Sequence, residues 1–413
     1  MAFTRKSANT EPLYDEIFAT VQLAKDTISK YGEEAVTNAT IGSLYGEDNT
    51  IVAFNSVYHH YDQIPAKVKA AYGNIAGTDL FKKTVYEWVR QGVTLDLSYE
   101  VIASPGGTGA ISTMFTSFLE EGQTIILPDI AWGNYALIAA QNNIKTETYS
   151  LFEEDHFNLS SVKEIVRKVQ PTQDKIVFVI NDPCQNPTGY SLSNEEWKEL
   201  ISFFNEVSLE TPVIIINDVA YIDYAFDLEH SRDYMKNFND LNQNVLIGIA
   251  FSCSKTLTAY GLRCGASLLL GKDEEAVHHT AIVLAKEARA TWSNSPNGAM
   301  ENFIWVVNEN KDAFLKEKDS YIQLLKQRSD IFIEEAKECG LEIYPYKDGF
   351  FITLKIEDKD YAKQVKEALM KQNIFTVIIN KGIRIAICSL PLSKCKGLAY
   401  NIKQIMNSVE SRK

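Results

Sequence analysis

The side chains best suited to chemistry stand directly after short apolar runs. Lys255 ends the sequence Phe-Ser-Cys-Ser-Lys after one such run, and Asp218 follows another in Asn-Asp-Val-Ala-Tyr221. A lysine held among small residues at a strand end can lose its proton and form a Schiff base with a carbonyl compound. Open α/β sheets bind ligands at the carboxyl ends of their strands, where this aspartate would lie. Taken singly, each residue also fits an ordinary role, as a surface lysine and a capping aspartate.

Two turns offer further ligand contacts. Residues 104–110 read Ser-Pro-Gly-Gly-Thr-Gly-Ala between a predicted strand and a predicted helix, and residues 186–189 read Asn-Pro-Thr-Gly. Glycines let backbone N–H groups approach an anion, and the start of a helix adds partial positive charge. The first turn lacks the Gly-Lys-Ser/Thr ending of a P-loop and the GxGxxG spacing of a dinucleotide site, so it does not indicate a nucleotide. Either turn alone also fits a purely structural role.

The elements that must position these residues alternate along the chain. Short runs rich in Val and Ile predict buried strands at 101–103, 124–127, 176–181, 213–217, 245–251 and 265–270. Helical patterns lie between them at 109–119, 135–140, 160–169 and 194–204. Continuous apolar strands separated by helices indicate the α/β class, with a mainly parallel sheet covered on both faces.

After about Pro296 the pattern changes to α+β. It predicts helices at 297–307, 311–340 and 362–372 and short strands at 350–354, 375–379 and 382–387. Residues 13–30 also read as a helix that would complement this part. We therefore expect a large domain over residues 50–324 and a small domain made of residues 1–49 and 325–413.

The composition excludes several classes of protein. The 413 residues carry 41 Lys and Arg against 54 Asp and Glu, and this net charge of −13 argues against a nucleic-acid partner. No apolar run approaches the ~20 residues of a bilayer span, and the first residues contain no signal-peptide core. The six cysteines are scattered as in reduced proteins, and the His-His pairs at 59–60 and 278–279 lack metal-ligand spacing. We expect a cytoplasmic protein without membrane or metal partners.

The order of the motifs is more specific than any one of them. Gly-Gly-Thr-Gly, Trp132, Asn-Pro-Thr-Gly, Asp-x-x-Tyr, Ser-x-x-Lys and an Arg eight residues after the lysine follow one another along the chain. This series resembles the aspartate aminotransferase family, the class I/II aminotransferases of fold type I that depend on pyridoxal 5′-phosphate (PLP). The resemblance extends from about Thr40 to Arg384, and it implies a large PLP-binding domain with a mainly parallel sheet and a smaller α+β domain.

The resemblance implies how PLP is held. Lys255 would bind the cofactor as an imine and then shuttle a proton, Asp218 would pair with the pyridinium nitrogen, and Trp132 would stack on the ring. Tyr221 and Asn186 would hydrogen-bond the phenolic oxygen. The phosphate would be held by a further set of residues, which are Gly107, Thr108, Ser252 and Arg263, with Tyr72 from the neighbouring subunit of a homodimer.

One position departs from the family pattern. Aspartate aminotransferases have a histidine shortly after the stacking tryptophan, and that histidine supports the pyridine aspartate. This chain has Tyr135 there. A phenol can still donate a hydrogen bond to Asp218, but the exchange leaves the support of ring protonation open.

Substrate contacts follow from the same resemblance. Arg384 would bind the α-carboxylate, together with Asn186 and the backbone near Gly42. Arg289, in Arg-Ala-Thr-Trp-Ser-Asn294, matches the family's arginine that reaches across the dimer to a distal carboxylate. A planar guanidinium binds a carboxylate through two parallel hydrogen bonds. An arginine on a helix surface is the plain alternative for Arg289.

The resemblance thus implies an aminotransferase that moves an amino group between an L-amino acid and a 2-oxo acid by ping-pong chemistry, with aspartate or glutamate as our preferred donor. Aromatic aminotransferases can keep the same arginine and move it aside, so an aromatic substrate stays open. A C–S lyase or a β-decarboxylase of the same fold would use the same cofactor contacts. A PLP-fold regulator would need a basic module ahead of Thr40, where the segment is short and not basic.

Overall fold

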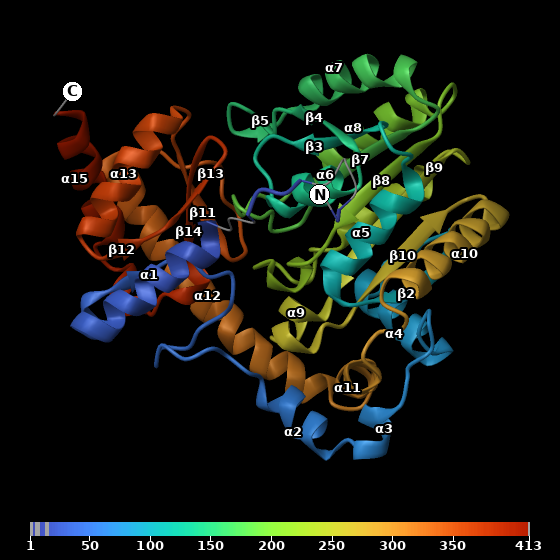
Figure 1. Ribbon diagram of the computed structural model, residues 1–413, viewed down its shortest axis with the longest axis horizontal. Helices are drawn as coiled ribbons and strands as arrows, with labels where there is room; N and C mark the ends of the chain where they lie inside the picture. Colours follow the sequence, from blue (N-terminus) through green and yellow to red (C-terminus); the bar gives the residue numbers. More distant parts are fainter. Residues whose placement is uncertain (1–2, 5–8, 13–15, 412–413) are drawn as a thin grey trace.

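The centre of the molecule is a seven-stranded sheet (Figure 1), seen in a computed structural model that describes residues 3–4, 9–12 and 16–411. The strand order is β2-β10-β9-β8-β7-β3-β4, and only β10 runs antiparallel to its neighbours. The bounds are β2 Ser98–Ser104, β3 Thr124–Pro128, β4 Lys145–Tyr149, β7 Ile176–Asn181, β8 Val213–Asp218, β9 Val245–Ser252 and β10 Gly265–Gly271. The six predicted strands are all present. The edge strand β4 was not predicted, because its sequence, Lys-Thr-Glu-Thr-Tyr, contains no apolar run.

Both faces of this sheet are buried by helices. In β7, Ile176, Phe178 and Ile180 enter one apolar cluster, whereas Val177 and Val179 enter the other, as the two-residue period of a strand requires. The second cluster is completed by α5 Gly106–Phe118, α6 Asn134–Gln141 and α10 Glu274–Thr291. The first is completed by α4 Asp79–Arg90, α7 Leu159–Val169, α8 Asn194–Val207 and α11 Asn297–Asn308.

A second, three-stranded antiparallel sheet lies apart from the first, on the left in Figure 1. Its order is β11-β14-β13, with bounds β11 Phe351–Lys355, β13 Val377–Ile379 and β14 Gly382–Ala386. The surrounding helices are α1 Glu16–Tyr31, α12 Lys311–Cys339, α13 Lys359–Lys371, α14 Leu392–Cys395 and α15 Leu398–Glu410. The predicted boundary at 324/325 falls inside α12, and the division into two domains stays a prediction. Residues 13–15 of the predicted first helix lie outside the described residues.

The single strand predicted at 375–379 is wrong. The segment forms β12, Ile374–Phe375, and β13, which pair with different partners. β12 runs parallel to β1, Thr37–Asn38, whereas β13 pairs with β14. An apolar run records burial but not the partner strand, so the change of partner at Thr376 could not be read from the sequence.

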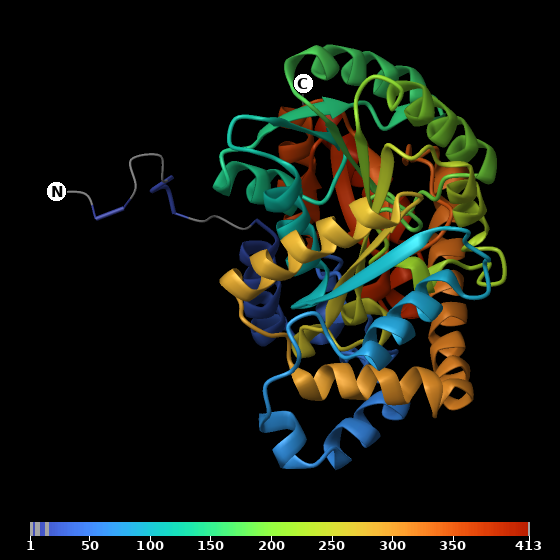
Figure 2. The ribbon, with the colours of Figure 1, turned by 90° about the vertical axis from the view of Figure 1, so that its right-hand side faces the viewer.

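Three helices build the lower part of the molecule. α11 packs against α2, Asn55–Gln63, and α3, Ala66–Ala70, and Figure 2 shows it lying above both. The remaining short elements are β5 Phe152–Glu153, β6 His156–Phe157 and α9 Cys253–Thr256. Within the described part of the chain, no helix has the length and apolar character needed to span a membrane.

A buried ionic network fastens the helices to the sheet. The Asp223 carboxylate accepts hydrogen bonds from Arg232 at 2.6 Å, Trp88 at 3.0 Å and Thr256 at 2.6 Å. Lys318 Nζ lies 3.3 Å from the same carboxylate, and both side chains are almost wholly buried. Burial alone would raise the pKa of Asp223, but Lys318 and Arg232 hold it well below its usual range. Because Thr256 belongs to α9, this network also fixes the helix that carries Lys255.

Asp223→Asn should lower the free energy of unfolding by about 3–5 kcal/mol, because two buried cations then face a neutral amide. Urea denaturation at pH 7 measures this loss. The difference from wild type should shrink as the pH falls below about 4, since a carboxylate with a depressed pKa stabilises the fold only while it is ionised.

Lys326→Met is the matched control, because it removes the exposed Lys326–Asp330 pair on α12. This change should cost less than about 1 kcal/mol. If both variants lose the same free energy of unfolding, the Asp223 network does not stabilise the fold more than an exposed ion pair does.

Candidate active site

Polar side chains gather where the strands of the central sheet end. β7 ends at Asn181, β8 at Asp218 and β9 at Ser252. The register pairs Asn181 with Asp218, and Asp218 with Ala250, two residues before Ser252. Parallel strands share one carboxyl edge, so these side chains are brought together, as the sequence predicts.

Lys255 extends from α9 into a space walled by aromatic rings. Its Nζ lies 4.7 Å from the centre of the Tyr260 ring and 5.5 Å from that of Tyr221, and it donates a hydrogen bond to the Gly42 carbonyl. Burial lowers the pKa of Lys255 to about 8, and the nearby Arg384 adds to the shift. A substantial fraction of the amine is therefore neutral near physiological pH, which a nucleophile requires.

Asp218 is buried beside Tyr135. The Tyr135 hydroxyl donates a 2.5 Å hydrogen bond to Oδ2 of Asp218, and the Ala220 amide donates one of 3.0 Å to Oδ1. Burial raises the pKa of Asp218 to about 6, and both hydrogen bonds oppose that shift. Burial and the neighbouring carboxylate raise the pKa of Tyr135 well above its usual range, so the phenol keeps its proton. The pair is thus a carboxylate with a neutral donor at pH 7.

The glycine-rich turn lets two side chains approach the start of α5 closely. Gly106 has φ of +76°, and a Cβ there would lie 2.6 Å from the Arg263 guanidinium. A Cβ at Gly107 would lie 3.3 Å from Ser252. Glycine therefore brings a serine and an arginine next to the first N–H groups of α5, and this grouping of donors suits a phosphate. The helix was predicted to start at Gly109 and starts at Gly106 instead, because tertiary contacts override the poor helix propensity of two glycines.

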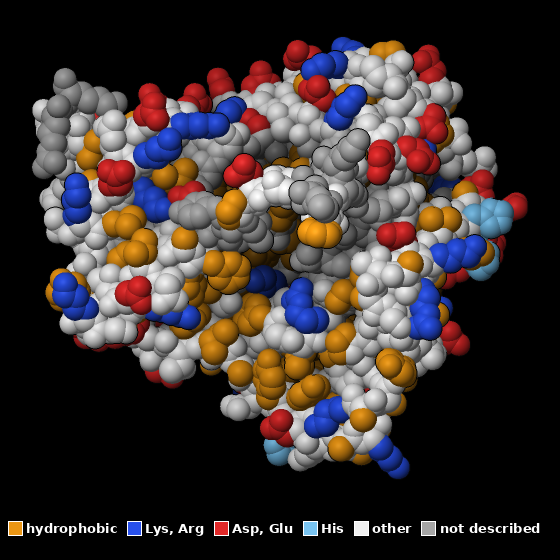
Figure 3. All heavy atoms as spheres, viewed as in Figure 1, with side chains coloured by type: hydrophobic (Ala, Val, Ile, Leu, Met, Phe, Trp, Pro, Cys, Tyr) orange, Lys and Arg blue, Asp and Glu red, His pale blue; other side chains and the backbone are white. Residues whose placement is uncertain are grey.

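Arg384 connects the second sheet to this edge. From β14 it donates hydrogen bonds to Asn186 Oδ1 at 3.2 Å and to the Thr40 carbonyl at 2.8 Å, and its guanidinium lies 4.3 Å from the centre of the Phe351 ring. Asn186 and Arg384 line a cleft of about 480 Å³ together with Trp132. Figure 3 shows the surface hollowed between the two parts of the molecule.

Residues that the sequence analysis missed hold the segment that covers Lys255. The Leu44 amide donates to the Tyr260 hydroxyl at 2.9 Å, and the Cys388 thiol donates to the Ser43 carbonyl at 3.3 Å. Tyr260 lies between Lys255 and Arg263 in the sequence, and that position is a signal that could have identified it. Cys388 gave no such signal, because only the fold brings it to the site.

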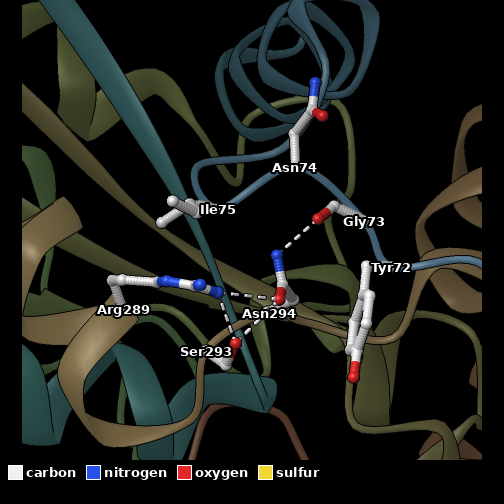
Figure 4. A pocket seen from close by; sticks show the side chains of 7 residues that line it. All are labelled: Tyr72, Gly73, Asn74, Ile75, Arg289, Ser293 and Asn294. Carbon is white, nitrogen blue, oxygen red and sulfur yellow. Dashed lines mark hydrogen bonds between the residues drawn. The ribbon is translucent and has the colours of Figure 1, made fainter.

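Tyr72 and Arg289 lie together, but in another place. They line a surface pocket of about 600 Å³, shown in Figure 4, with the other lining residues Gly73, Asn74, Ile75, Ser293 and Asn294. The Arg289 guanidinium donates to Ser293 Oγ at 2.5 Å and to Asn294 Oδ1 at 3.3 Å. Among the described residues, none that lines this pocket also lines the cleft of Arg384. The structure therefore groups Tyr72 with Arg289 and separates both from the cleft on the same chain.

The carboxyl edge of the central sheet offers groups that match each part of PLP. The donors at the start of α5 fit the phosphate, Asp218 fits a basic ring nitrogen, and the amine of Lys255 fits an aldehyde carbon. Thr108 is exposed at the start of α5, next to Gly107. The buried Arg384 adds a site for a carboxylate.

Comparison with known proteins agrees with this chemistry. The model of the family described as aminotransferase class I and II matches residues 40–402. Mitochondrial aspartate aminotransferase of Gallus gallus is 23% identical over 74% of this chain and 72% of that protein. An aromatic-amino-acid aminotransferase of Pseudomonas aeruginosa is 27% identical over 49% of each chain. The crystal structure of an aminotransferase from Anaerococcus prevotii is 35% identical, with a TM-score of 0.95 over 98% of this chain and 100% of that chain.

The family match covers the seven-stranded and three-stranded sheets and the strand ends at Asn181, Asp218 and Ser252. The chain therefore belongs to the class I and II aminotransferase family, whose members are PLP-dependent transferases.

Proposed function

We propose that this aminotransferase takes its amino group from an acidic amino acid, aspartate or glutamate, and that it works as a homodimer with shared sites. The observation that carries the proposal is the exposed Arg289, which lies with the half-buried Ser293 and Asn294 beside Tyr72 and away from the chain's own cleft. A guanidinium aimed from one subunit into the cleft of the other would bind the second carboxylate of such a substrate.

The residues at the carboxyl edge of the sheet would divide the chemistry among them. PLP, when bound, conjugates the substrate nitrogen with a protonated ring and so weakens the Cα–H bond. The charge of Asp218 would favour the protonated ring nitrogen, and each pKa unit of that effect is worth about 1.4 kcal/mol. Lys255, once released by substrate, would take the proton from Cα and return it, a role that suits a pKa of about 8.

Further contacts would hold the cofactor and orient the substrate. Tyr221 and Asn186 would hydrogen-bond the phenolic oxygen of PLP, and Trp132 would stack on its ring. Arg384 would bind the α-carboxylate beside Gly42. The phosphate would be held by the residues at and near the start of α5, which are Gly107, Thr108, Ser252 and Arg263, with Tyr72 of the partner subunit.

Exposed apolar side chains support a dimer. Ile51, Tyr72, Ile75 and Leu80 are all exposed, Tyr72 by 90%. Figure 3 shows apolar side chains gathered on the lower half of that face. Tyr72 and Ile75 line the same surface pocket, and clustered apolar surface marks interaction sites on soluble proteins. In a two-fold dimer each copy would supply Tyr72 and Arg289 to the other.

An aromatic substrate is the second candidate. Arg289 is exposed, and its two hydrogen-bond partners are neutral, so little holds the guanidinium when no second carboxylate is present. Trp292 lies three residues further on and packs against an apolar cluster, which offers an apolar wall. The family relatives include enzymes named for aspartate and enzymes named for aromatic amino acids.

The location proposed for the protein is the cytoplasm. All six cysteines are free thiols, which supports a reducing compartment.

Borohydride reduction of the purified enzyme should leave PLP attached to a peptide that contains Lys255, because among the described lysines only this one combines a lowered pKa with the carboxyl edge of the sheet. Mass spectrometry of the digest identifies the peptide. Lys255→Ala should remove the label and the visible absorbance of the bound cofactor. A label on another lysine would contradict the assignment.

Arg289→Ala should lower kcat/KM for aspartate by roughly 10- to 150-fold, since a charge-assisted Arg–carboxylate bond is worth about 1.5–3 kcal/mol. The rate with phenylalanine should change little. Lys286→Ala, an exposed cation on the same helix, is the control and should leave both rates unchanged. Equal losses with aspartate and phenylalanine would favour the aromatic candidate, and 2-oxo acid formation from a panel of twenty amino acids would then identify the donor.

Mixing Lys255→Ala subunits with Arg289→Ala subunits should restore part of the activity with aspartate, because one of the two sites in a hybrid dimer then has both residues. Subunit exchange is checked by native mass spectrometry, and each variant alone is the control. Hybrid dimers without restored activity would contradict the sharing of sites.

A further inference from the structure

Asp218 is a buried carboxylate whose hydrogen-bond donors are neutral. It is 5% exposed, and its carboxylate oxygens accept from the Tyr135 hydroxyl and the Ala220 amide. No cation of the described residues forms a salt bridge with it. Asp223, five residues later, is instead paired with Arg232 and Lys318. The ionised state of Asp218 therefore depends on two hydrogen bonds, of which one comes from a side chain.

Tyr135 is itself held rigidly for this contact. It lies at the start of α6 and is 1% exposed, and its ring packs edge-on against Trp132 with ring centres 5.4 Å apart. Its amide donates to the Trp132 carbonyl at 3.2 Å. The same turn of chain thus carries the residue expected to stack on the PLP ring and the residue that contacts Asp218.

We propose that Tyr135 is the positioning residue for Asp218, and that its hydroxyl keeps this carboxylate charged and oriented toward the ring nitrogen of PLP. The inference rests on the proposed binding of PLP at Lys255. A phenol differs from an imidazole because it donates a hydrogen bond and stays neutral throughout the physiological range. It therefore carries no positive charge that competes with the ring nitrogen of PLP for the negative charge of Asp218. Asp218 then keeps its full charge for the cofactor.

The hydroxyl can be removed without disturbing its surroundings. Tyr135→Phe keeps the ring and its packing on Trp132, and it deletes only the donor to Oδ2. The other titratable groups that face this pair are Tyr221, which follows β8, and Tyr149, on β4. Both are buried phenols, and burial raises their pKa values well above the usual range. Both therefore stay neutral near pH 7, so neither adds a charge that would offset the loss of the Tyr135 hydroxyl.

Tyr135→Phe should weaken PLP binding about 10- to 100-fold at pH 7, the range expected for a hydrogen bond to a charged group. Equilibrium dialysis of the holoenzyme against graded PLP concentrations measures this dissociation constant. Burial already raises the pKa of Asp218 to about 6, and loss of the phenol removes an opposing contribution. The deficit should therefore be larger at pH 6 than at pH 9, where the carboxyl group is ionised in both proteins.

Two variants separate the hydroxyl from a packing role. Tyr135→His supplies another N–H donor and should restore PLP affinity to within about threefold of wild type. Tyr149→Phe is the matched control, because this phenol is equally buried near Tyr135 but donates to the Val179 carbonyl, at 3.2 Å, instead of to Asp218. It should leave PLP affinity unchanged. If Tyr135→Phe does not fold, Tyr135→His and Tyr135→Leu give the same comparison of donor against no donor.

The inference is overturned if Tyr135→Phe binds PLP with wild-type affinity and pH dependence, or if the histidine variant is as weak as the variant without a donor. A wild type that binds no PLP would overturn the proposed function and this inference together. Wild-type binding with an unaffected Tyr135→Phe overturns the inference alone.

Discussion

The register between β8 and its two neighbours sets the geometry of the active site. Asn181 pairs with Asp218, and Asp218 pairs with Ala250, so β9 reaches Ser252 and then α9 at a fixed distance from the carboxylate. A slip of one residue would turn each side chain of a strand to the other face. The continuous burial of β7 and β8 on both faces prevents such a slip, because it would exchange the apolar side chains of two differently shaped cores.

Two buried carboxylates that follow β8 or end it have opposite pKa shifts, because their partners differ. Asp223 faces two cations, which hold its pKa far below the usual range and make it a structural charge. Asp218 has only neutral donors, and burial raises its pKa to about 6. A charge that is not already neutralised by the protein is available to a cofactor. The difference between structural and chemical roles therefore lies in the partners and not in the residue type.

The chain separates its polar groups into a deep cleft and a surface pocket. Arg384 is buried between the two sheets, whereas Arg289 and Tyr72 are exposed on the outside. In the proposed function, the two arginines bind two different carboxylates, one common to all amino acids and one specific to acidic ones. The proposed second copy of the chain would complement the exposed arginine and tyrosine, because a two-fold axis would complete both clefts at once.

The sequence by itself determined six of the seven strands of the central sheet and the order of the residues at their ends. Runs of Val and Ile report burial on both faces, and small or polar residues after them report the edge where ligands bind. It also indicated that Tyr135 departs from the family pattern, but not what this side chain contacts.

Tertiary structure decided the antiparallel direction of β10, the polar edge strand β4 and the change of partner at Thr376. It also decided that Tyr135 reaches Asp218 across 83 residues, and that Tyr260 and Cys388 hold the segment over Lys255. Local patterns record how deeply a residue is buried, but contacts between distant residues depend on register and packing, which no short stretch of sequence specifies.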